Sequence, residues 1–239
     1  MHTHRTTVGG IAGSSHPPPT GWVLATGFAL TLVAGGINAV GFLGVQHQAL
    51  THLTGTITQF SLQTARGSAG PAMEALGIIG AFFAGSVMSG LIVRKSSLRV
   101  GRRYGVALML EAALLVGAVW LLRRGSTQGG DQLASLACGL QNGLATSYAG
   151  AVIRTTHMTG IVTDLGLACA HRLRGDRRES TRLRLHAALL AGFVLGGVAG
   201  TLGFARLGMD ALLVPAMIVG LGGLAYWLWK HTQRNVAAA

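Results

Sequence analysis

Long apolar segments separated by short polar ones run through the whole chain. Six of them are close to the roughly 20 residues that a helix needs to span a bilayer. They contain no lysine or arginine and cover residues 21–45, 73–93, 104–122, 133–153, 185–205 and 211–229. Two shorter segments, 52–66 and 157–170, are too polar for a helix that faces lipid. The pattern predicts an all-α membrane protein with about six transmembrane helices and two short polar half-helices.

The composition agrees with this class. Half of the 239 residues are hydrophobic and 11% are charged, against about 25% charged residues in a soluble domain. The net charge of +12 does not predict a nucleic-acid partner here, because the arginines fall in short loops between apolar segments. We expect a multi-pass protein of the plasma membrane with the lipid bilayer as its partner. Cys138 and Cys169 lie in apolar segments and predict neither a disulfide nor a metal site, and no cofactor is expected.

The chain contains the same polar motif twice, as THLTGTIT in residues 51–58 and as THMTGIVT in residues 156–163. The offset between the two histidines is 157 − 52 = 105 residues. A Gly-x-x-Asn pair precedes each copy at an offset of 104, with Gly35 and Asn38 matching Gly139 and Asn142. A stripe of small residues follows each copy at an offset of 111, with Ala81, Gly85 and Ser89 matching Gly192, Gly196 and Gly200. Internal duplication of an apolar chain is typical of transporters.

The predicted organisation is a first repeat over residues 21–122 and a second over 131–230, which together form one membrane domain. A polar N-terminal tail, residues 1–20, precedes it, and residues 231–239 form a C-terminal tail. The small-residue stripes are expected to be grooves in which helix backbones approach closely. The same faces could also form a homodimer.

The charged loops distinguish two topologies. The loop at 94–103 carries five lysines and arginines and the loop at 172–184 carries six arginines. These loops share one membrane face, together with both termini, only if the two short segments do not cross, so the positive-inside rule favours six spans and cytoplasmic termini. A half with an odd number of crossings places its copy upside down. We therefore predict inverted repeats, whose histidine motifs meet, or nearly meet, near the bilayer midplane.

Several motifs resemble those of a known family. They are the Asn-bearing first helix followed by HLTGT at 52–56, the GLQNGL run at 139–144 and the TTHMTG signature at 155–160. These residues resemble the YoaK-like family of bacterial multi-pass membrane proteins, the domain of unknown function 1275, over about residues 21–230. The resemblance implies a multi-pass membrane protein with no established substrate. Family members often carry an acidic residue where this chain has Asn38, and an Asn where it has Thr56, so this chain lacks any proton coupling through that carboxylate.

Polar side chains at membrane depth are the candidates for a solute site or an ion site, because burying them is costly unless they are partnered or functional. For each histidine, the alternative is that it braces the break in its own half. The threonines and glycines could instead serve the local backbone, and the asparagines could bind across helices. The candidates are Asn38, His52, Thr54, Gly55, Asn142, His157, Thr159, Gly160 and Asp164.

Three charged residues in or beside the apolar segments are further candidates, and one of them, Asp164, breaks the pseudo-symmetry. Asp164 is a candidate cation or proton site, with a structural hydrogen bond to a neighbouring helix as the alternative, and its counterpart at offset 105 is Gln59. Glu111 lies midway along an apolar segment, with Arg154 as a conceivable partner. A buried structural pair and a transport role both remain open for them.

The predicted function is a small-solute transporter or channel whose midplane site is formed by the two Thr-His-x-Thr-Gly motifs. Helix N-termini there would favour an anion, whereas Asp164 would favour a cation, so the solute stays open. A non-transporting membrane scaffold or sensor is the alternative. An intramembrane enzyme is a weaker hypothesis, because the zinc-protease, nucleophile-elbow and nucleotide-binding motifs are absent from the sequence. We therefore do not expect an enzyme.

Overall fold

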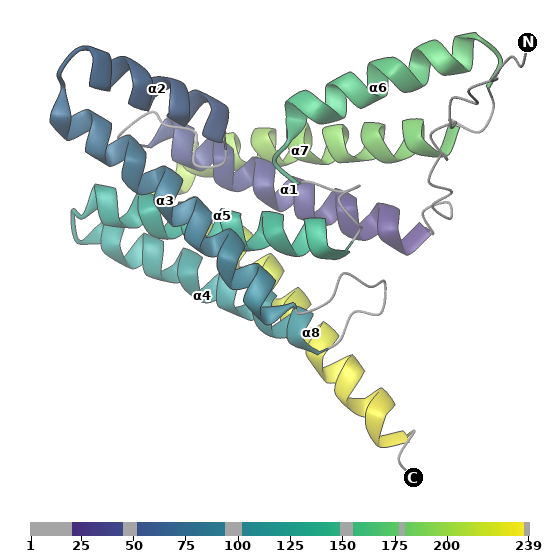
Figure 1. The fold of residues 1–239 in the computed structure, drawn as a ribbon. Coiled ribbons are helices and arrows are strands. Elements are labelled where there is room, and N and C mark those ends of the chain that lie inside the picture. Colours follow the sequence, from purple (N-terminus) through teal and green to yellow (C-terminus); the bar gives the residue numbers. More distant parts are fainter. Residues whose placement is uncertain (1–20, 45–51, 94–101, 149–154, 177–179, 237–239) are drawn as a thin grey trace, which may run out of the picture.

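The computed structural model describes residues 21–44, 52–93, 102–148, 155–176 and 180–236, and these residues are almost entirely helical (Figure 1). The first half of the chain contains α1 (Gly21–Leu43), α2 (Leu53–Ala65), α3 (Ala69–Ile92) and α4 (Arg103–Arg123). The second half contains α5 (Thr127–Tyr148), α6 (Met158–Leu173), α7 (Ser180–Leu207), the short 3-10 helix η2 (Gly208–Leu212) and α8 (Leu213–Val236). The predicted all-helical class is confirmed for the described residues.

Most boundaries lie within a few residues of the predicted segments, and two differ more. Helix α5 begins at Thr127, so its first turns include Asp131 and are more polar than the predicted span. Helix α8 continues to Val236, beyond residue 230 where the second repeat was predicted to end. Judged by length and hydropathy, the described helices give four candidate spans: α1, α3, α4 and one continuous stretch, Ser180–Gln233, that contains α7 and most of α8.

Helices α2 and α6 end in the same way. After α2, the Ser68 amide donates to the Gln63 carbonyl, and after α6, the Asp176 amide donates to the His171 carbonyl. Each of these 6→1 bonds spans a glycine with positive φ, Gly67 at 71° and Gly175 at 93°, a conformation that glycine adopts without steric cost. Both short helices therefore stop at a glycine and turn back into the next long helix.

The long helices pack in two similar pairs, α1 with α7 and α3 with α5. Glycines allow the backbones to touch: a Cβ on Gly35 would strike the Phe193 carbonyl, and one on Gly139 would strike the Phe82 carbonyl. These two contacts join matched positions, since 139 − 35 = 104 and 193 − 82 = 111. A second matched pair of contacts has the same form, with Gly196 against Leu32 and Gly85 against Leu136.

These contacts also fix the directions of the helices. Residue numbers rise together along the α1–α7 interface, from Gly192 near Phe28 to Gly200 near Gly36, so the two helices are parallel. Helices α3 and α5 are parallel for the same reason. Helices α4 and α8 are antiparallel, because Gly105 lies against Gly223 while Gly220 lies against Ala112. In Figure 1, α1, α4 and α7 run from right to left, and α3, α5 and α8 run from left to right.

The small-residue stripes therefore serve packing within one chain. Gly85, Ser89, Gly192 and Gly196 are buried against α5 or α1. Many exposed large apolar side chains lie on the outside of the spans, among them Phe83, Leu91, Leu202 and Leu221, as expected for helices that face lipid.

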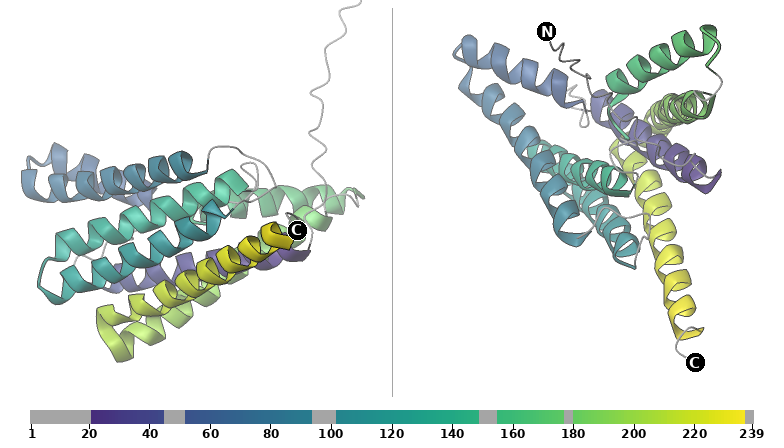
Figure 2. Two further views of the ribbon diagram at one scale, coloured as in Figure 1. Left: turned by 90° about the horizontal axis from the view of Figure 1, so that it is seen from below. Right: turned by 45° about the vertical axis from the view of Figure 1, so that its right-hand side comes forward.

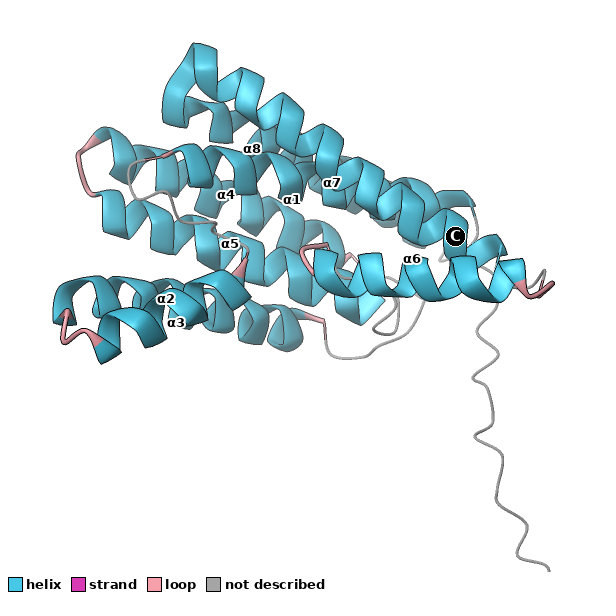
Figure 3. Cartoon of the chain, turned by 90° about the horizontal axis from the view of Figure 1, so that it is seen from above, coloured by secondary structure: helices cyan, strands magenta, loops and turns pink. Residues whose placement is uncertain are grey.

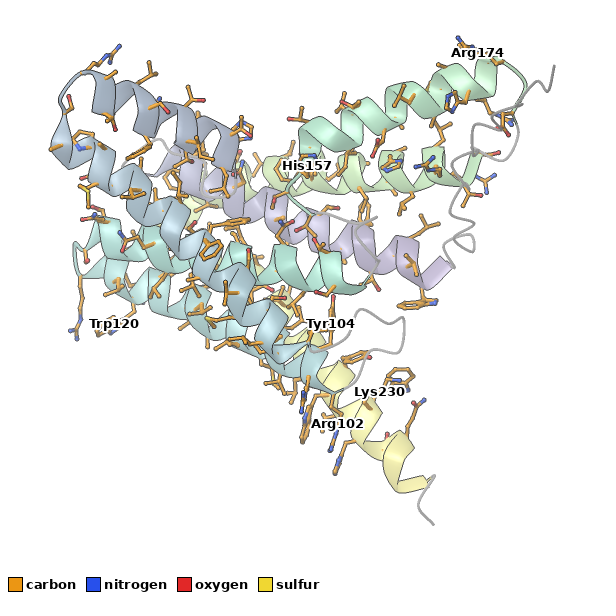
Figure 4. The ribbon with its side chains drawn as sticks, viewed as in Figure 1. Arg102, Tyr104, Trp120, His157, Arg174 and Lys230 are labelled. Atoms are coloured by element: carbon orange, nitrogen blue, oxygen red, sulfur yellow. The ribbon has the colours of Figure 1, made fainter. Side chains whose placement is uncertain are left out.

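Aromatic and cationic side chains pair near both ends of the bundle. The Arg124 guanidinium lies 4.0 Å from the centre of the Trp120 ring after α4, and the Lys230 ammonium lies 4.5 Å from the Trp229 ring near the end of α8. Figure 4 shows Trp120 on the left of the molecule and Lys230 on the right. Tryptophan is enriched at the two membrane–water interfaces, so this placement fits a membrane-embedded bundle.

Candidate functional site

The two repeated histidines occupy the same structural position at the start of a half-helix. His52 precedes α2 with φ −92° and ψ 67°, and His157 precedes α6 with φ −90° and ψ 60°. Their carbonyls accept hydrogen bonds from the amides of Thr56 (3.2 Å) and Ile161 (3.1 Å), which form the first turn of each helix. Neither imidazole makes a side-chain capping bond to its helix.

The glycine three residues after each histidine has a local steric role. A Cβ on Gly55 would lie 2.9 Å from Cδ2 of His52, and one on Gly160 would collide with the His157 ring. The imidazole therefore lies over the first turn of its own helix. It occupies space that the Cβ of any residue other than glycine would fill. This accounts for the His-x-x-Gly spacing in both copies without a ligand.

The threonines of the motif also show matched local bonds. The Thr58 hydroxyl donates to the Thr54 carbonyl, and the Thr163 hydroxyl donates to the Thr159 carbonyl. Both hydrogen bonds are 2.9 Å long. The side chains of Thr54 and Thr159 are exposed, and so are both histidines, whereas Thr56 and Ile161 are buried. Each half-helix thus has a packed face and an exposed face, which carries these threonines and which no described helix covers.

The half-helices lie on one side of the long-helix bundle and diverge from its centre. Their N-terminal ends face each other, and α2 runs toward one end of the molecule while α6 runs toward the other (Figures 1 and 3). Figure 2 shows the same arrangement from two further directions. Among the described residues, α2 packs on α3 and α6 packs on α7, but α2 and α6 do not contact each other. The two histidine motifs therefore face each other without meeting.

The other polar candidates lie on the long helices. Asn38 on α1 and Asn142 on α5 are partly buried. The Asn142 Oδ1 atom is buried and has no hydrogen-bond partner among the described residues. Its neighbour Gln141, which the sequence analysis did not select, is fully buried, and neither polar atom of its side chain is bonded there. Gln141 could have been selected from the sequence, because it is a polar residue in the same GLQNGL run as Asn142.

Glu111 is a fully buried carboxyl group on α4. Leu108 on one side of it belongs to one apolar cluster and Leu115 on the other side belongs to a second, so Glu111 lies where the two clusters meet. Neither carboxylate oxygen has a hydrogen-bond partner among the described residues. The predicted partner Arg154 lies outside those residues.

Asp164 contacts a residue that sequence reasoning missed. Its Oδ2 lies 3.5 Å from Nε2 of His186 on α7, and the exposed side-chain fractions are 52% for Asp164 and 4% for His186. Asp164 is thus in contact with a neighbouring helix. His186 could have been noticed as a titratable residue within a run that is otherwise apolar. Within the described ranges, no three His, Cys, Asp or Glu side chains gather as they would to hold a metal ion.

These features define a helical membrane protein: apolar helices, glycine-mediated backbone contacts and aromatic–cation pairs at both ends. Residues 26–225 match the model of the family described as "Protein of unknown function (DUF1275)", so the chain belongs to that family. Comparisons with curated proteins and with solved structures gave no match. Membership of the predicted domain of unknown function 1275 is therefore confirmed, and the role of the site has to be argued from its geometry.

Proposed function

We propose that this protein is a small-solute transporter or channel, built from two inverted repeats, with its solute site between the starts of α2 and α6. One observation carries the proposal: on one side of an apolar bundle, two short polar helices begin about midway along its length and run in opposite directions (Figure 1). The first turn of a helix has amide groups without an intrahelical partner and a partial positive charge. Two such starts facing each other offer donors to a polar or anionic solute.

The helix directions support six spans. If all eight helices crossed the membrane, α4 and α8 would be separated by an even number of crossings and would run the same way. They are antiparallel. With α2 and α6 as half-helices, α1, α4 and α7 cross in one direction and α3, α5 and α8 cross in the other, which agrees with the contacts. Three crossings per half also invert the second repeat relative to the first.

The distribution of charge supports cytoplasmic termini. The described arginines at the end of the bundle that holds the start of α1 are Arg102, Arg103, Arg172, Arg174, Arg182 and Arg184, and Lys230 lies there too. The opposite end holds Arg66, Arg123, Arg124 and Arg206. Figure 4 places Arg174 at the upper right, Lys230 and Arg102 below and slightly right of the centre, and Trp120 on the left. The positive-inside rule assigns the first end to the cytoplasm.

Cysteine accessibility tests the proposal. In a background without Cys138 and Cys169, single cysteines replace Thr54 and Thr159, which are exposed, or Thr56 and Ile161, which are buried. A charged, membrane-impermeant thiol reagent is expected to label positions 54 and 159 and to leave 56 and 161 unlabelled. Phe83→Cys on α3 controls for lipid exposure, because its side chain is 68% exposed in the middle of an apolar helix. Protection of 54 and 159 to the level of position 83 would contradict a water-filled pathway.

The second candidate is a membrane scaffold whose motif only stabilises the fold. It is favoured by the local use of the same residues, with the imidazoles folded over Gly55 and Gly160 and the Thr58 and Thr163 hydroxyls bonded within their helices. The labelling experiment separates the two functions, because a scaffold needs no water at positions 54 and 159.

A further inference from the structure

The two half-helices differ in the residues that line their packed faces. Ile161, Asp164 and Ala168 follow one another at helical spacing on α6, where Ile161 and Ala168 are buried. The corresponding residues of α2, at offset 105, are Thr56, Gln59 and Gln63. Only the second copy therefore carries a titratable group on this face.

The partner of Asp164 is also specific to the second half. His186 is buried on α7, and its counterpart at offset 111 is Ala75 on α3. The pair Asp164 and His186 thus replaces Gln59 and Ala75, although the two helix pairs are otherwise built alike. The second half therefore contains both members of the pair, and the first half contains neither.

We propose that the Asp164–His186 pair is a proton site that holds the second half-helix against the bundle. A proton taken up from water by the His186 imidazole converts its contact with the Asp164 carboxylate into an ion pair, and its release restores a neutral imidazole. Because His186 is buried, this attraction is stronger than it would be between two groups in water. Because α7 is the helix on which α6 packs, protonation tightens α6 and fixes the start of α6 at His157. The proton site itself does not depend on the proposed function. The inference rests on that function only where it treats the start of α6 as part of a solute site.

Few other groups can produce the same response. The titratable or charged residues of α6 are His157 before its first turn, Cys169, His171 and Arg172, and those of α7 near His186 are Arg182 and Arg184. Helix α1, which packs along α7, has none between Gly21 and Leu43. On η2, which packs at the far end of α7, the charged group is Asp210. His171 is exposed and lies at the end of α6, so it offers a matched control.

Hydrogen–deuterium exchange of the purified protein in nanodiscs tests this site without a known solute. Exchange would be followed for the α6 segment and for α2 from pH 5.5 to 7.5, with labelling times scaled for the chemical exchange rate. Histidine ordinarily titrates in this range. We expect α6 to exchange about threefold to tenfold more slowly at pH 5.5 than at pH 7.5, and α2 to show no change.

Asp164→Asn and His186→Gln should each remove the pH dependence of α6, while His171→Gln should keep it. Protection of α2 reports whether each variant is folded, and Asp164→Asn alters a half-exposed side chain, so at least one variant is expected to fold. A pH-independent α6 in the wild type, or a response that survives in Asp164→Asn, would overturn the proton site. Either result leaves the cysteine-labelling test of transport intact, so the two proposals fail separately.

Discussion

At the scale of single residues, the His-x-x-Gly pattern has a steric explanation that can be tested. Gly160→Ala places a methyl group where the His157 ring lies, whereas Gly166→Ala, on the same helix, meets no atom within 4 Å. We expect Gly160→Ala to lower the free energy of unfolding by about 1 kcal/mol relative to Gly166→Ala, because the imidazole must leave the helix start. Thermal unfolding in detergent measures this difference. Equal midpoints for the two variants would show that the ring does not rest on Gly160.

Glu111 makes a second prediction at this scale. A buried carboxyl group without a partner costs free energy, so an apolar residue of similar volume should be more stable there. Glu111→Met is expected to raise the thermal midpoint, with Met109→Leu on the same helix as a control for repacking. A lower midpoint for Glu111→Met would indicate that the carboxyl group is partnered outside the described residues, as the predicted pair with Arg154 requires.

The sequence could predict the candidate histidines but not the partner of Asp164. His52 and His157 are visible because their motif occurs twice. His186 has no counterpart in the first half, and its contact with Asp164 depends on how α6 folds back on α7. Gln141 was overlooked for a related reason, since Asn142 beside it matched the repeat and Gln141 did not.

At the scale of helices, close backbone packing should make two matched glycines intolerant of substitution. A methyl group at Gly85 or Gly196 would strike a backbone carbonyl of α5 or α1, which cannot move as a side chain can. Gly85→Ala and Gly196→Ala are each expected to destabilise the protein by about 1–3 kcal/mol. Gly90→Ala and Gly197→Ala on the same two helices are the controls, since neither methyl group would collide. Similar stability of all four variants would contradict the parallel helix pairs.

An ion pair ties the end of α4 to η2. The Arg123 guanidinium donates hydrogen bonds of 2.8 and 2.7 Å to the two carboxylate oxygens of Asp210. These bonds hold the pKa of Asp210 below its ordinary value. Such a group adds stability above its unfolded pKa, about 3.9, and the contribution is lost as pH falls through the lower folded value.

The stability of Asp210→Asn should therefore be lower than that of the wild type at pH 7, and the difference should shrink below about pH 4. Both partners are well exposed, at 60% and 37%, so the effect is expected to be small and to weaken with salt. Thermal midpoints between pH 3 and pH 7 measure it. A difference that grows toward low pH has the wrong sign for this ion pair.

The helix boundaries were predictable where apolar runs end at charged or glycine-containing turns. They were less predictable at α5, because its first turns contain Asp131 and two glycines and are still helical. There the packing of α5 between α3 and α4 outweighs local polarity. The turn between α7 and α8 was predictable, because the apolar segments 185–205 and 211–229 are separate in the sequence, and the short η2 helix lies where they separate.

At the scale of the whole molecule, the duplication could be predicted from the sequence. The way in which the two halves pack together could not. Matched offsets predicted two similar halves, but they did not reveal that α1 packs on α7 and α5 on α3, so that each half contacts the other through equivalent glycines. Charge counting gave a topology that the helix directions support. The separation between the starts of α2 and α6 depends on the three-dimensional packing of both halves, and the sequence contains no signal for it.

The most direct test of the inverted architecture is to determine on which membrane face the turns after α2 and α6 lie. With six spans, Arg66 after α2 and Arg174 after α6 lie on opposite membrane faces, whereas eight crossings would place both on the same face. Single cysteines at 66 and 174 in intact cells, treated with an impermeant thiol reagent before and after permeabilisation, distinguish these topologies. We predict labelling of position 66 from outside and of position 174 only after permeabilisation. Labelling of both from the same side would contradict the inverted repeats and, with them, the central site.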